Sequence, residues 1–549
     1  MKSDDARFEA GGGTLVSRRQ FVLGAAVVTA AAVGCGDDSA ADPAAGGAGG
    51  QGAGGGAGAG GAPPLLDGVR IVSVEPTADG ATLLWETAEG TGTYHLLIAK
   101  QQTARAEAVV RSGDLTGEVT EAGQQEIAIS GLASERDYQL HLVQVDAGGA
   151  RSEVASAELT TLARATTGTT YRSGTDLGWA AGENVGDQLR EWLAQTAQPG
   201  DELVLEATYL LSGGVAVLPA DFVLSAVAGA GFESVDPSSQ GRMLELGDRC
   251  ILRNVSVTHP AAPNTGTTAI NPVAGTDYYQ MAAVAIAGHD VLLERCRFAN
   301  HIGQHVLVDQ VRRLEMRNCH IEGGFWAVTV TGHDHLFYEC LFERSLGDGI
   351  KTLRGEAMGV QRPLVQRCVY QHNNRDGIDT TGGFQDGVIE DTIFRNIQVG
   401  GCDFKTIVEG PADLSIDLTN TNIRLERCDV SDCTNFVVCS LVDRANLVDG
   451  ESAPTWAPHD FFLIDCIVER NEGAGEARVV LFKGAHSLTY DDLQLLGDVN
   501  VYKASSPYDT FGLGTPEASA ALNYGVDGTS TEGAPRGPST AVPFAFGPA

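Results

Sequence analysis

Short apolar strands repeat along most of the chain. Segments such as VLLERCRFAN, LEMRNCHIEG, LFYECLFERS and LVQRCVYQHN carry cysteine in the same position, and VIEDTIFRNI carries Thr392 there. Cys296, Cys319, Cys340 and Cys368 are separated by 23, 21 and 28 positions, a period typical of a solenoid. The repeats predict an all-β, right-handed parallel β-helix over residues 165–514. In it the cysteines stack inward as small apolar residues, not as a metal cluster or a catalytic thiol.

The ends of this region have their own patterns. An amphipathic helix is expected from about Val185 to Thr196, followed by a Pro-Gly turn and a strand. Helix, turn and strand together resemble the N-terminal cap of a right-handed parallel β-helix, which closes the exposed end of the solenoid. Residues 515–549 are rich in Gly, Ala, Ser, Thr and Pro, and we expect a loose tail. Cys433 and Cys439 are disulfide candidates, although sequence cannot assign the pairing.

Residues 65–164 show short alternating strands separated by turn signals, which predicts a β-sandwich. Trp85 lies on the second strand, and Leu132 and Tyr138 are six positions apart ahead of a later strand. This pattern resembles a fibronectin type III domain, and the segment has no cysteine. Trp85 and Tyr138 are expected in its core, and the domain is expected to be a spacer or a weak binding module.

The first residues form a targeting segment. In SRRQFVLGAAVVTAAAVGC, Arg18 and Arg19 precede an apolar run that is too short to span a bilayer. The arginine pair resembles a twin-arginine export signal, and AVGC resembles a lipobox, which would make Cys35 a lipidated residue. A plain cleavage site is the alternative. Residues 1–35 are therefore expected to be a signal peptide, and residues 36–64 a Gly/Ala-rich linker.

This segment predicts an exported bacterial protein, either a periplasmic or cell-surface lipoprotein or a secreted protein. A lipid anchor is expected, and no later segment is apolar for long enough to be a membrane helix. The net charge is −34, from 37 basic and 71 acidic residues, which argues against nucleic acid as a partner. An acidic polymer would need a local basic or metal-lined patch. We expect a monomer.

Charged residues gather on the strands that follow the cysteine strands. Aligned from the cysteine position, three of them read GDGIKTL, RDGIDTT and GCDFKTI. Because strand side chains alternate between faces, the alignment places one column of residues inward and its two neighbours outward. The inward column is Ile350, Ile378 and Phe404. The outward columns are Leu307, Val328, Lys351, Asp379, Lys405 and Val437, and His305, Trp326, Gly349, Gly377, Asp403 and Asn435, with Asp348 above Asp376 at the mouth of the same face.

Several carboxylates on neighbouring turns raise one another's pKa or bind a cation. Asp348, Asp376 and Asp379 offer oxygen ligands that suit calcium. A lysine beside a bound divalent ion has a lowered pKa and can act as a base. The alternative is that Asp-Gly only marks a turn, and that Lys351 over Asp379 over Lys405 is a surface ion-pair ladder of little energetic value.

The charged block resembles the pectate lyases of polysaccharide lyase family nine, whose pattern runs ADGF, NxDDGFD and a later GFK. Here GDGIK supplies Asp348, NRDGID supplies Asp376 and Asp379, and CDFK supplies Lys405. The resemblance covers about 90 residues with specificity. It implies β-elimination from a uronic-acid polysaccharide, with Lys405 as the base and calcium, held by the three aspartates, neutralising the substrate carboxylate.

Two departures from that family matter. Arg375 stands where the family has a further acid, and Lys351 is an extra cation beside Asp379. Either calcium binds more weakly here, or Arg375 and Lys351 neutralise the carboxylate without it. Lys351 and Arg354 join Lys405 as candidate catalytic groups.

Arg375, Trp326 and His305 are the candidate substrate-binding residues. Trp326 would offer its ring to a sugar face. Glycoside hydrolases of this fold carry an Asn-Thr-Asp, Asp-Asp, Gly-His-Gly series, and alginate epimerases an Asp-Pro-His element; neither is found. A non-catalytic, lipid-anchored β-helix that binds polysaccharide or a protein partner is the alternative function.

Overall fold

The computed structural model describes residues 65–66, 68–88, 90–164, 168–235, 242–260, 281–301, 303–352, 359–408, 418–443, 459–470, 477–483, 487–497, 499–504 and 525–533. The signal segment with Cys35, the linker and Arg354 lie outside the described residues. Among the described helices, none is both long enough and apolar enough to cross a membrane.

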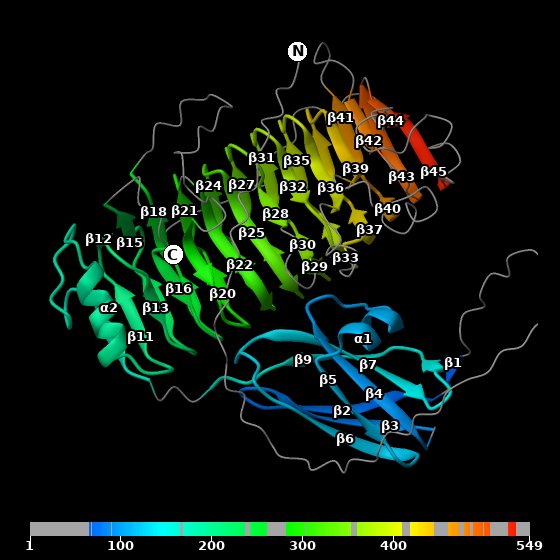
Figure 1. The fold of residues 1–549 in the computed structure, drawn as a ribbon, viewed down its shortest axis with the longest axis horizontal. Coiled ribbons are helices and arrows are strands. Elements are labelled where there is room, and N and C mark those ends of the chain that lie inside the picture. The colour runs from blue at the N-terminus through cyan, green and yellow to red at the C-terminus, as the bar shows by residue number, and fades with distance from the viewer. Residues whose placement is uncertain are drawn as a thin grey trace, which may run out of the picture. The chain divides into compact units, whose positions relative to one another are not determined.

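The N-terminal part is a β-sandwich with α1 (Ala106–Ser112) beside it (Figure 1). One antiparallel sheet contains β2 (Arg70–Pro76), β3 (Ala81–Thr87) and β6 (Gly123–Ile129). The other sheet, which is antiparallel apart from the β1–β8 pair, contains β1 (Leu65–Leu66), β8 (Arg151–Ser152), β7 (Asp137–Asp146), β4 (Gly92–Ala99), β5 (Leu115–Val119) and β9 (Ala155–Thr160).

The two sheets of the sandwich share one apolar core. Trp85 and Tyr138 are buried in it, as the sequence predicts, and so is Leu132. The Tyr138 hydroxyl accepts a hydrogen bond from the backbone N–H of Ala133 at 3.0 Å, which satisfies the polar end of a buried ring. The sandwich is confirmed, whereas its resemblance to fibronectin type III stays a prediction.

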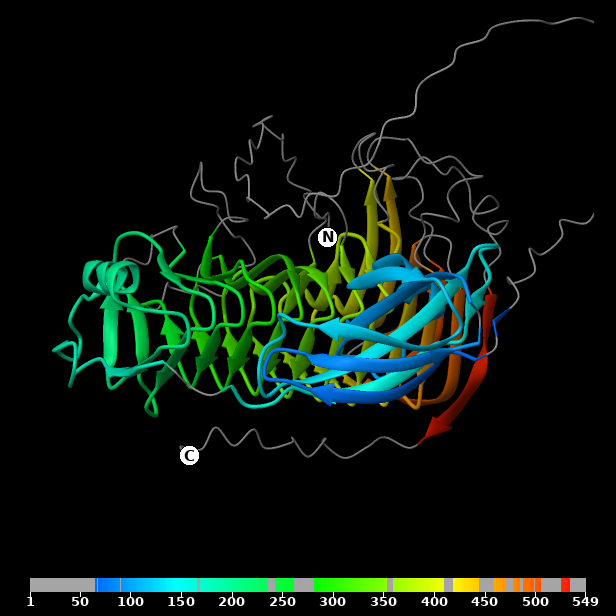
Figure 2. The same cartoon turned by 90° about the horizontal axis from the view of Figure 1, so that it is seen from below.

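The rest of the described chain is a parallel β-helix of three strand stacks, seen as successive rungs in Figures 1 and 2. The first stack contains β10 (Thr170–Arg172), β11 (Glu202–Leu205), β14 (Val223–Ala226), β17 (Ile251–Arg253), β20 (Leu292–Glu294), β23 (Glu315–Arg317), β26 (Leu336–Tyr338), β30 (Leu364–Gln366), β34 (Val388–Glu390), β37 (Thr421–Glu426), β40 (His459–Ile464), β43 (Ser487–Gly497) and β45 (Gly525–Gly533).

The second stack contains β12 (Thr208–Leu211), β15 (Gly231–Ser234), β18 (Ser256–Thr258), β21 (Arg297–Ala299), β24 (His320–Glu322), β27 (Leu341–Glu343), β31 (Val369–Gln371), β35 (Ile393–Arg395), β38 (Asp429–Ser431) and β41 (Ile467–Arg470). The third contains β13 (Ala216–Leu218), β16 (Leu244–Leu246), β19 (Ala282–Ile286), β22 (Gln304–Arg312), β25 (Trp326–His333), β28 (Ile350–Thr352), β32 (Asp376–Thr380), β36 (Gly400–Val408), β39 (Asn435–Asp443), β42 (Ala477–Lys483) and β44 (Val499–Ala504). Two short strands, β29 (Val360–Gln361) and β33 (Phe384–Gln385), pair in register after the third stack.

The cysteine ladder forms at the bend between the first and second stacks. Each ladder residue follows a residue in the left-handed backbone region, which turns the chain sharply and points the next side chain inward. These bend residues include Arg295 (φ 52°), Asn318 (φ 52°), Glu339 (φ 52°), Arg367 (φ 54°) and Asp391 (φ 49°). All ten cysteines among the described residues are buried and free, including the disulfide candidates Cys433 and Cys439. The inward ladder is therefore confirmed, and no disulfide joins the described cysteines.

Aromatic rings of the second stack extend the core along the β-helix. Tyr370 stacks on Phe342 with ring centroids 4.7 Å apart, and on Phe394 at 5.0 Å. Such stacks contribute energy beyond the area that they bury, and they fix the position of each turn on the next.

The two ends differ in how far they follow the sequence prediction. Helix α2 (Gly186–Gln195) is present, and its Leu189 and Leu193 pack into the core of the β-helix. It therefore covers the apolar end, as a cap should. At the other end, β45 pairs with β43 inside the segment for which a loose tail is predicted, so that tail is not without structure throughout.

Candidate functional site

The charged cluster lies on three successive strands of the third stack, β28, β32 and β36. Ile350 pairs with Ile378 and Lys351 pairs with Asp379, as the alignment predicts. On the next turn, however, Asp379 pairs with Asp403 rather than with Lys405. The prediction is thus wrong by two residues at this turn. Because side chains alternate with a period of two, Asp403 and Lys405 still share the face of Asp379.

Other turns are offset from the alignment by an odd number of residues, one at Val328 and three at Val437, and there the predicted face is wrong. Val328 pairs with Ile350, and Val437 pairs with Cys402. Both valines are buried in the core instead of pointing outward. A one-residue slip moves every side chain of a strand to the opposite face. The residue beside Lys351 on β25 is Thr329.

Gly349 and Gly377 were also expected on the outer face, and this is wrong. A Cβ atom on Gly349 would lie 2.7 Å from the ring of Tyr370, and one on Gly377 would lie 2.8 Å from the ring of Phe394. Both positions therefore face the aromatic stack of the core. Glycine is required there because the ring leaves no room for a side chain.

Asp379 is bound by two ammonium groups. Its Oδ2 accepts a hydrogen bond from Lys351 Nζ, and its Oδ1 accepts one from Lys405 Nζ at 2.8 Å. The carboxylate is fully buried. Burial alone would raise the pKa of Asp379, but the two lysines outweigh burial and hold that pKa below its ordinary value. Asp379 is therefore a carboxylate anion with both oxygens engaged.

Lys405 is held between two acids. Besides Asp379, its Nζ lies 2.9 Å from Oδ2 of Asp403. Burial alone would lower the pKa of Lys405, yet the charges of Asp379 and Asp403 raise it above the ordinary lysine value. The sequence argument expected a lowered pKa beside a divalent ion, and the arrangement of these acids has the opposite effect. Lys405 is thus an ammonium group in this arrangement.

Asp348 and Asp376 lie one above the other, as predicted. The backbone N–H of Asp376 donates to Oδ1 of Asp348 at 3.3 Å. Both side chains are fully buried, and neither oxygen of Asp376 has a hydrogen-bond partner among the described residues. Burial and the charge of Asp379 raise the pKa of Asp348 to about 6. Burial and the charge of Asp403 raise the pKa of Asp376 well above its ordinary value.

The three aspartates provide oxygen donors for a divalent cation, but two cationic side chains already lie among them. Oxygens of Asp348, Asp376 and Asp379 lie within 4.8 Å of one another. Lys351 Nζ lies 3.8 Å from Oδ2 of Asp348, in addition to its bond with Asp379. Arg375 lies 4.0 Å from both Asp348 and Asp379. Calcium needs six to eight oxygen ligands, and in this arrangement the residues do not fit such an ion.

The remaining predicted site residues differ in their environment. The Arg375 side chain is 46% exposed, so solvent and ligands reach it. Trp326 is buried, with its ring centroid 5.8 Å from Lys351 Nζ. His305 is fully buried, and its Nε2 is hydrogen-bonded to the backbone carbonyl of Glu322 at 3.0 Å. The structure therefore places His305 in the interior, so its predicted position on the outer face is wrong, and its role in substrate binding stays a prediction.

One expected residue and one unexpected residue complete the cluster. Asp403, which was expected on the outer face, binds Lys405 and is buried. Thr329 is fully buried next to Lys351, and its hydroxyl has no partner among the described residues. Thr329 was missed because the alignment put Val328 in its place.

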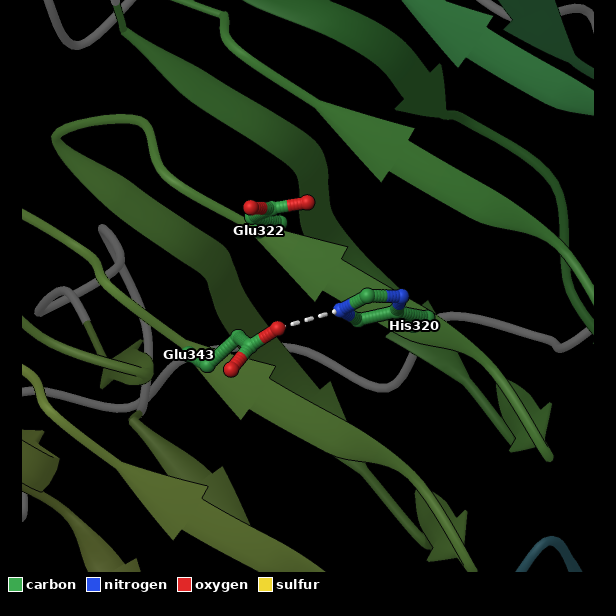
Figure 3. A group of neighbouring side chains, drawn as sticks. All are labelled: His320, Glu322 and Glu343. Carbon is green, nitrogen blue, oxygen red and sulfur yellow. Dashed lines mark hydrogen bonds and ion pairs between the residues drawn. The ribbon is translucent and has the colours of Figure 1, made fainter. Parts of the chain in front are cut away.

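A second charged group, His320, Glu322 and Glu343, lies on β24 and β27 of the second stack (Figure 3). His320 Nε2 bonds Oε1 of Glu343 at 2.9 Å. Every carboxylate oxygen of the two glutamates has a partner. Those of Glu322 accept hydrogen bonds from Arg344 at 2.7 Å and Arg297 at 3.2 Å, and Oε2 of Glu343 accepts one from Gln371 at 2.7 Å. The group is a satisfied ion-pair ladder.

Comparison with known proteins supports the fold. Residues 277–408, less than half of the chain, match the family described as right handed beta helix region. No match was found among curated proteins. Among solved structures, the family 28 exopolygalacturonase of Yersinia enterocolitica is 13% identical, with a TM-score of 0.30 over 85% of this chain and 99% of that chain.

Two further solved structures have similarly low sequence identities to this chain. The hyperthermoactive exopolygalacturonase of Thermotoga maritima is 12% identical, with a TM-score of 0.39 over 60% of this chain and 88% of that chain. Pectate lyase Pel9A is 11% identical, with a TM-score of 0.35 over 62% of this chain and 80% of that chain. Likenesses at these TM-scores carry no argument about function. With the family match, the chain contains a right-handed parallel β-helix.

Proposed function

We propose that the protein cleaves a uronic-acid polysaccharide by β-elimination, with Lys405 as the base. The observation that carries the proposal is the position of Lys405 Nζ, bonded to Asp379 and Asp403 in a cluster that also includes the half-exposed Arg375. The motifs GDGIK, NRDGID and CDFK, which resemble those of family-nine pectate lyases, supply these residues.

The reaction requires three events at the sugar. A cation must neutralise the C6 carboxylate, which makes the C5 proton more acidic. Lys405, in its neutral form, takes that proton, the C4–O bond breaks, and the electron pair forms a C4–C5 double bond. The leaving oxygen takes a proton from water or a neighbouring acid. Arg375 is the exposed cation of the cluster, and its planar guanidinium suits a carboxylate.

One feature favours the non-catalytic alternative. Both oxygens of Asp379 and the ammonium group of Lys405 already have partners within the protein. A cluster of this kind also serves a β-helix that binds a polysaccharide without cleaving it. The two functions differ in a single respect, which is turnover.

Ultraviolet absorbance of the unsaturated product tests the proposal. The purified protein is incubated with polygalacturonate, pectin, alginate and glycosaminoglycans. We expect product from one of them, and a loss of about 100-fold or more in Lys405→Ala, the range for removal of a general base. Arg424→Ala is the matched control, because Arg424 is an exposed cation bonded to Glu426 on the first stack. No product from any polymer would sink the lyase proposal and leave the binding function.

We also propose that the protein is exported and anchored through Cys35. The twin arginines, the short apolar run and the AVGC sequence support this proposal. Mass spectrometry of the membrane fraction should find acyl chains on an N-terminal Cys35. Recovery of a Cys35→Ala variant in the same membrane fraction would contradict the anchor.

A further inference from the structure

The side chain of Lys351 occupies the space between two carboxylates from different turns. Its Nζ bonds Oδ2 of Asp379 on β32 and lies 3.8 Å from Oδ2 of Asp348 at the start of its own turn. The side chain is 7% exposed, and both aspartate side chains are at 0%. The ammonium group is therefore a fixed part of the cluster and not a mobile surface charge.

A divalent cation bound by Asp348 and Asp379 would need the same oxygens. Two like charges cannot share a few ångströms in a buried site without a large cost. Moving Lys351 away would also leave a buried ammonium group without its carboxylate, and breaking a buried pair in this way is strongly unfavourable. The positive charge that would otherwise come from an ion is thus supplied by the chain.

Arg375 stands in a different relation to the same acids. Its guanidinium lies 4.0 Å from Asp348 and 4.0 Å from Asp379, at the limit of an ion pair. With 46% of its side chain exposed, the guanidinium keeps donors available to a ligand. Arginine binds carboxylates through two parallel N–H···O bonds. The cluster therefore contains two kinds of cation. Lys351 is buried and binds the acids of the cluster, whereas Arg375 is exposed and can bind the acid of a ligand.

We propose that Lys351 takes the place of a divalent cation between Asp348 and Asp379, and that Arg375 binds the carboxylate of an acidic sugar, so that the site binds its ligand without a metal. The choice of a uronic acid as the ligand rests on the proposed function. The place of Lys351 among the acids does not.

Thermal unfolding of the full-length protein tests the role of Lys351 without any measurement of activity. A ligand that binds only the native state raises the Tm, and the increase grows with the logarithm of the ligand concentration once that concentration exceeds the Kd. We expect the Tm of the wild type to be the same in millimolar CaCl₂ and in EDTA. Lys351→Met removes the charge but keeps the bulk, and we expect calcium to raise the Tm of this variant by several degrees. Arg424→Ala is the control and should behave as the wild type.

The measurement on the wild type tests the proposal for Lys351 even if the Lys351→Met variant does not fold. A wild-type Tm that rises with calcium in the micromolar range, as for a specific site, would overturn the proposal. A folded Lys351→Met variant that gains no response to calcium would also count against Lys351 as the substitute for an ion.

Calorimetry with trigalacturonate and a mannuronate trimer tests the role of Arg375, with maltotriose as the neutral control. We expect one acidic trimer to bind in EDTA, and binding to weaken 10-fold or more in Arg375→Ala and less in Arg375→Lys. Binding that is lost in EDTA and restored by calcium overturns the inference, even if the protein proves to be a lyase. Binding in EDTA without turnover would refute the lyase function and leave the inference intact. Failure of both acidic trimers to bind in either condition overturns the assignment of Arg375.

Discussion

The ammonium nitrogen of Lys405 lies 2.8 Å from Oδ1 of Asp379, although the two residues are not opposite each other in the sheet. The residue opposite Asp379 is Asp403, and the Lys405 side chain reaches back along its own strand to bind both acids. Lys405 therefore faces two carboxylates, and its charge depends on both of them.

The proposed elimination should become faster as the pH rises. Asp379 and Asp403 raise the pKa of Lys405 above its ordinary value, against the opposing effect of burial. Only neutral Lys405 accepts a proton, and below its pKa the neutral fraction grows about tenfold per pH unit, so the rate at saturating substrate should grow with it. Initial rates between pH 6 and pH 10 measure this dependence.

The Asp403→Asn variant tests whether Lys405 is the group that sets this pH dependence. It removes one of the acids that stabilise the charged form of Lys405, so the pKa of Lys405 should fall and the pH–rate profile should move to lower pH. Asp391→Asn, at an exposed carboxylate bonded to Arg427, should leave the profile in place. A profile that Asp403→Asn does not move would show that Lys405 is not the base.

The fold was predictable because its signal is repeated. The cysteine position recurs on turn after turn, and each recurrence confirms the same inward direction, as the buried Cys319 and Cys340 show. The register of the third stack carries no such marker. The bend that leads into this stack takes up different numbers of residues on different turns, so counting from the cysteine gave Lys351 opposite Asp379 correctly and Val328 wrongly.

The charges of the candidate site were predictable, but their protonation was not. Sequence showed that Asp348, Asp376 and Asp379 would lie together. Whether Lys405 gains or loses a proton depends on which acids surround it, and its position relative to Asp379 on the neighbouring strand changes with a two-residue shift in pairing. A pattern with a period of two gives the face of a residue and leaves its neighbour on the next strand undetermined.

Asp379→Asn should destabilise the protein strongly. The substitution leaves Lys351 and Lys405, whose side chains are 7% and 16% exposed, without the carboxylate that both of them bind. Removing one partner of a buried ion pair costs about 3–5 kcal/mol. Urea denaturation of the variant and the wild type measures the difference in the free energy of unfolding.

Asp391→Asn gives the comparison for an exposed pair. Its side chain is 45% exposed and it bonds Arg427, so its loss should cost about 0–1 kcal/mol. Equal losses in the two variants would mean that the cluster around Asp379 is effectively solvated, and that the argument from its burial fails.

Gly377→Ala should disturb both the core and the site. The added Cβ would lie 2.6 Å from the carbonyl oxygen of Gly401 and 2.8 Å from the ring of Phe394. Neither the backbone of the next turn nor a stacked ring can move far, so we expect a loss of about 1–3 kcal/mol, as for overpacked cores. Gly214→Ala is the control, because the nearest atom to its Cβ would lie 4.0 Å away. Unchanged stability in Gly377→Ala would contradict the close packing of these turns.

Three buried histidines should lower the stability of the protein in mild acid, against Asp348 and Asp376, whose raised pKa values act in the opposite direction. The rings of His259 and His301 are 4.1 Å apart, and those of His301 and His305 are 6.1 Å apart. Burial lowers the pKa of all three, that of His259 to about 4 and that of His305 to about 3. Since the folded-state pKa lies below the unfolded value, their contribution is complete above about pH 6.5 and is lost as the pH falls toward 4.

Each of these histidines should contribute a slope of up to about 1.4 kcal/mol per pH unit in that range. Urea denaturation at pH 7.5, 6.0 and 5.0 measures the slope of the free energy of unfolding. His259→Phe should reduce it, because neither nitrogen of His259 has a hydrogen-bond partner among the described residues and a phenyl ring has nothing to protonate. Arg424→Ala is the control, because Arg424 is an exposed cation far from protonation in this range, and it should leave the slope unchanged. If His259→Phe and the wild type gave equal slopes, protonation of the buried histidines could not be the cause of the acid instability.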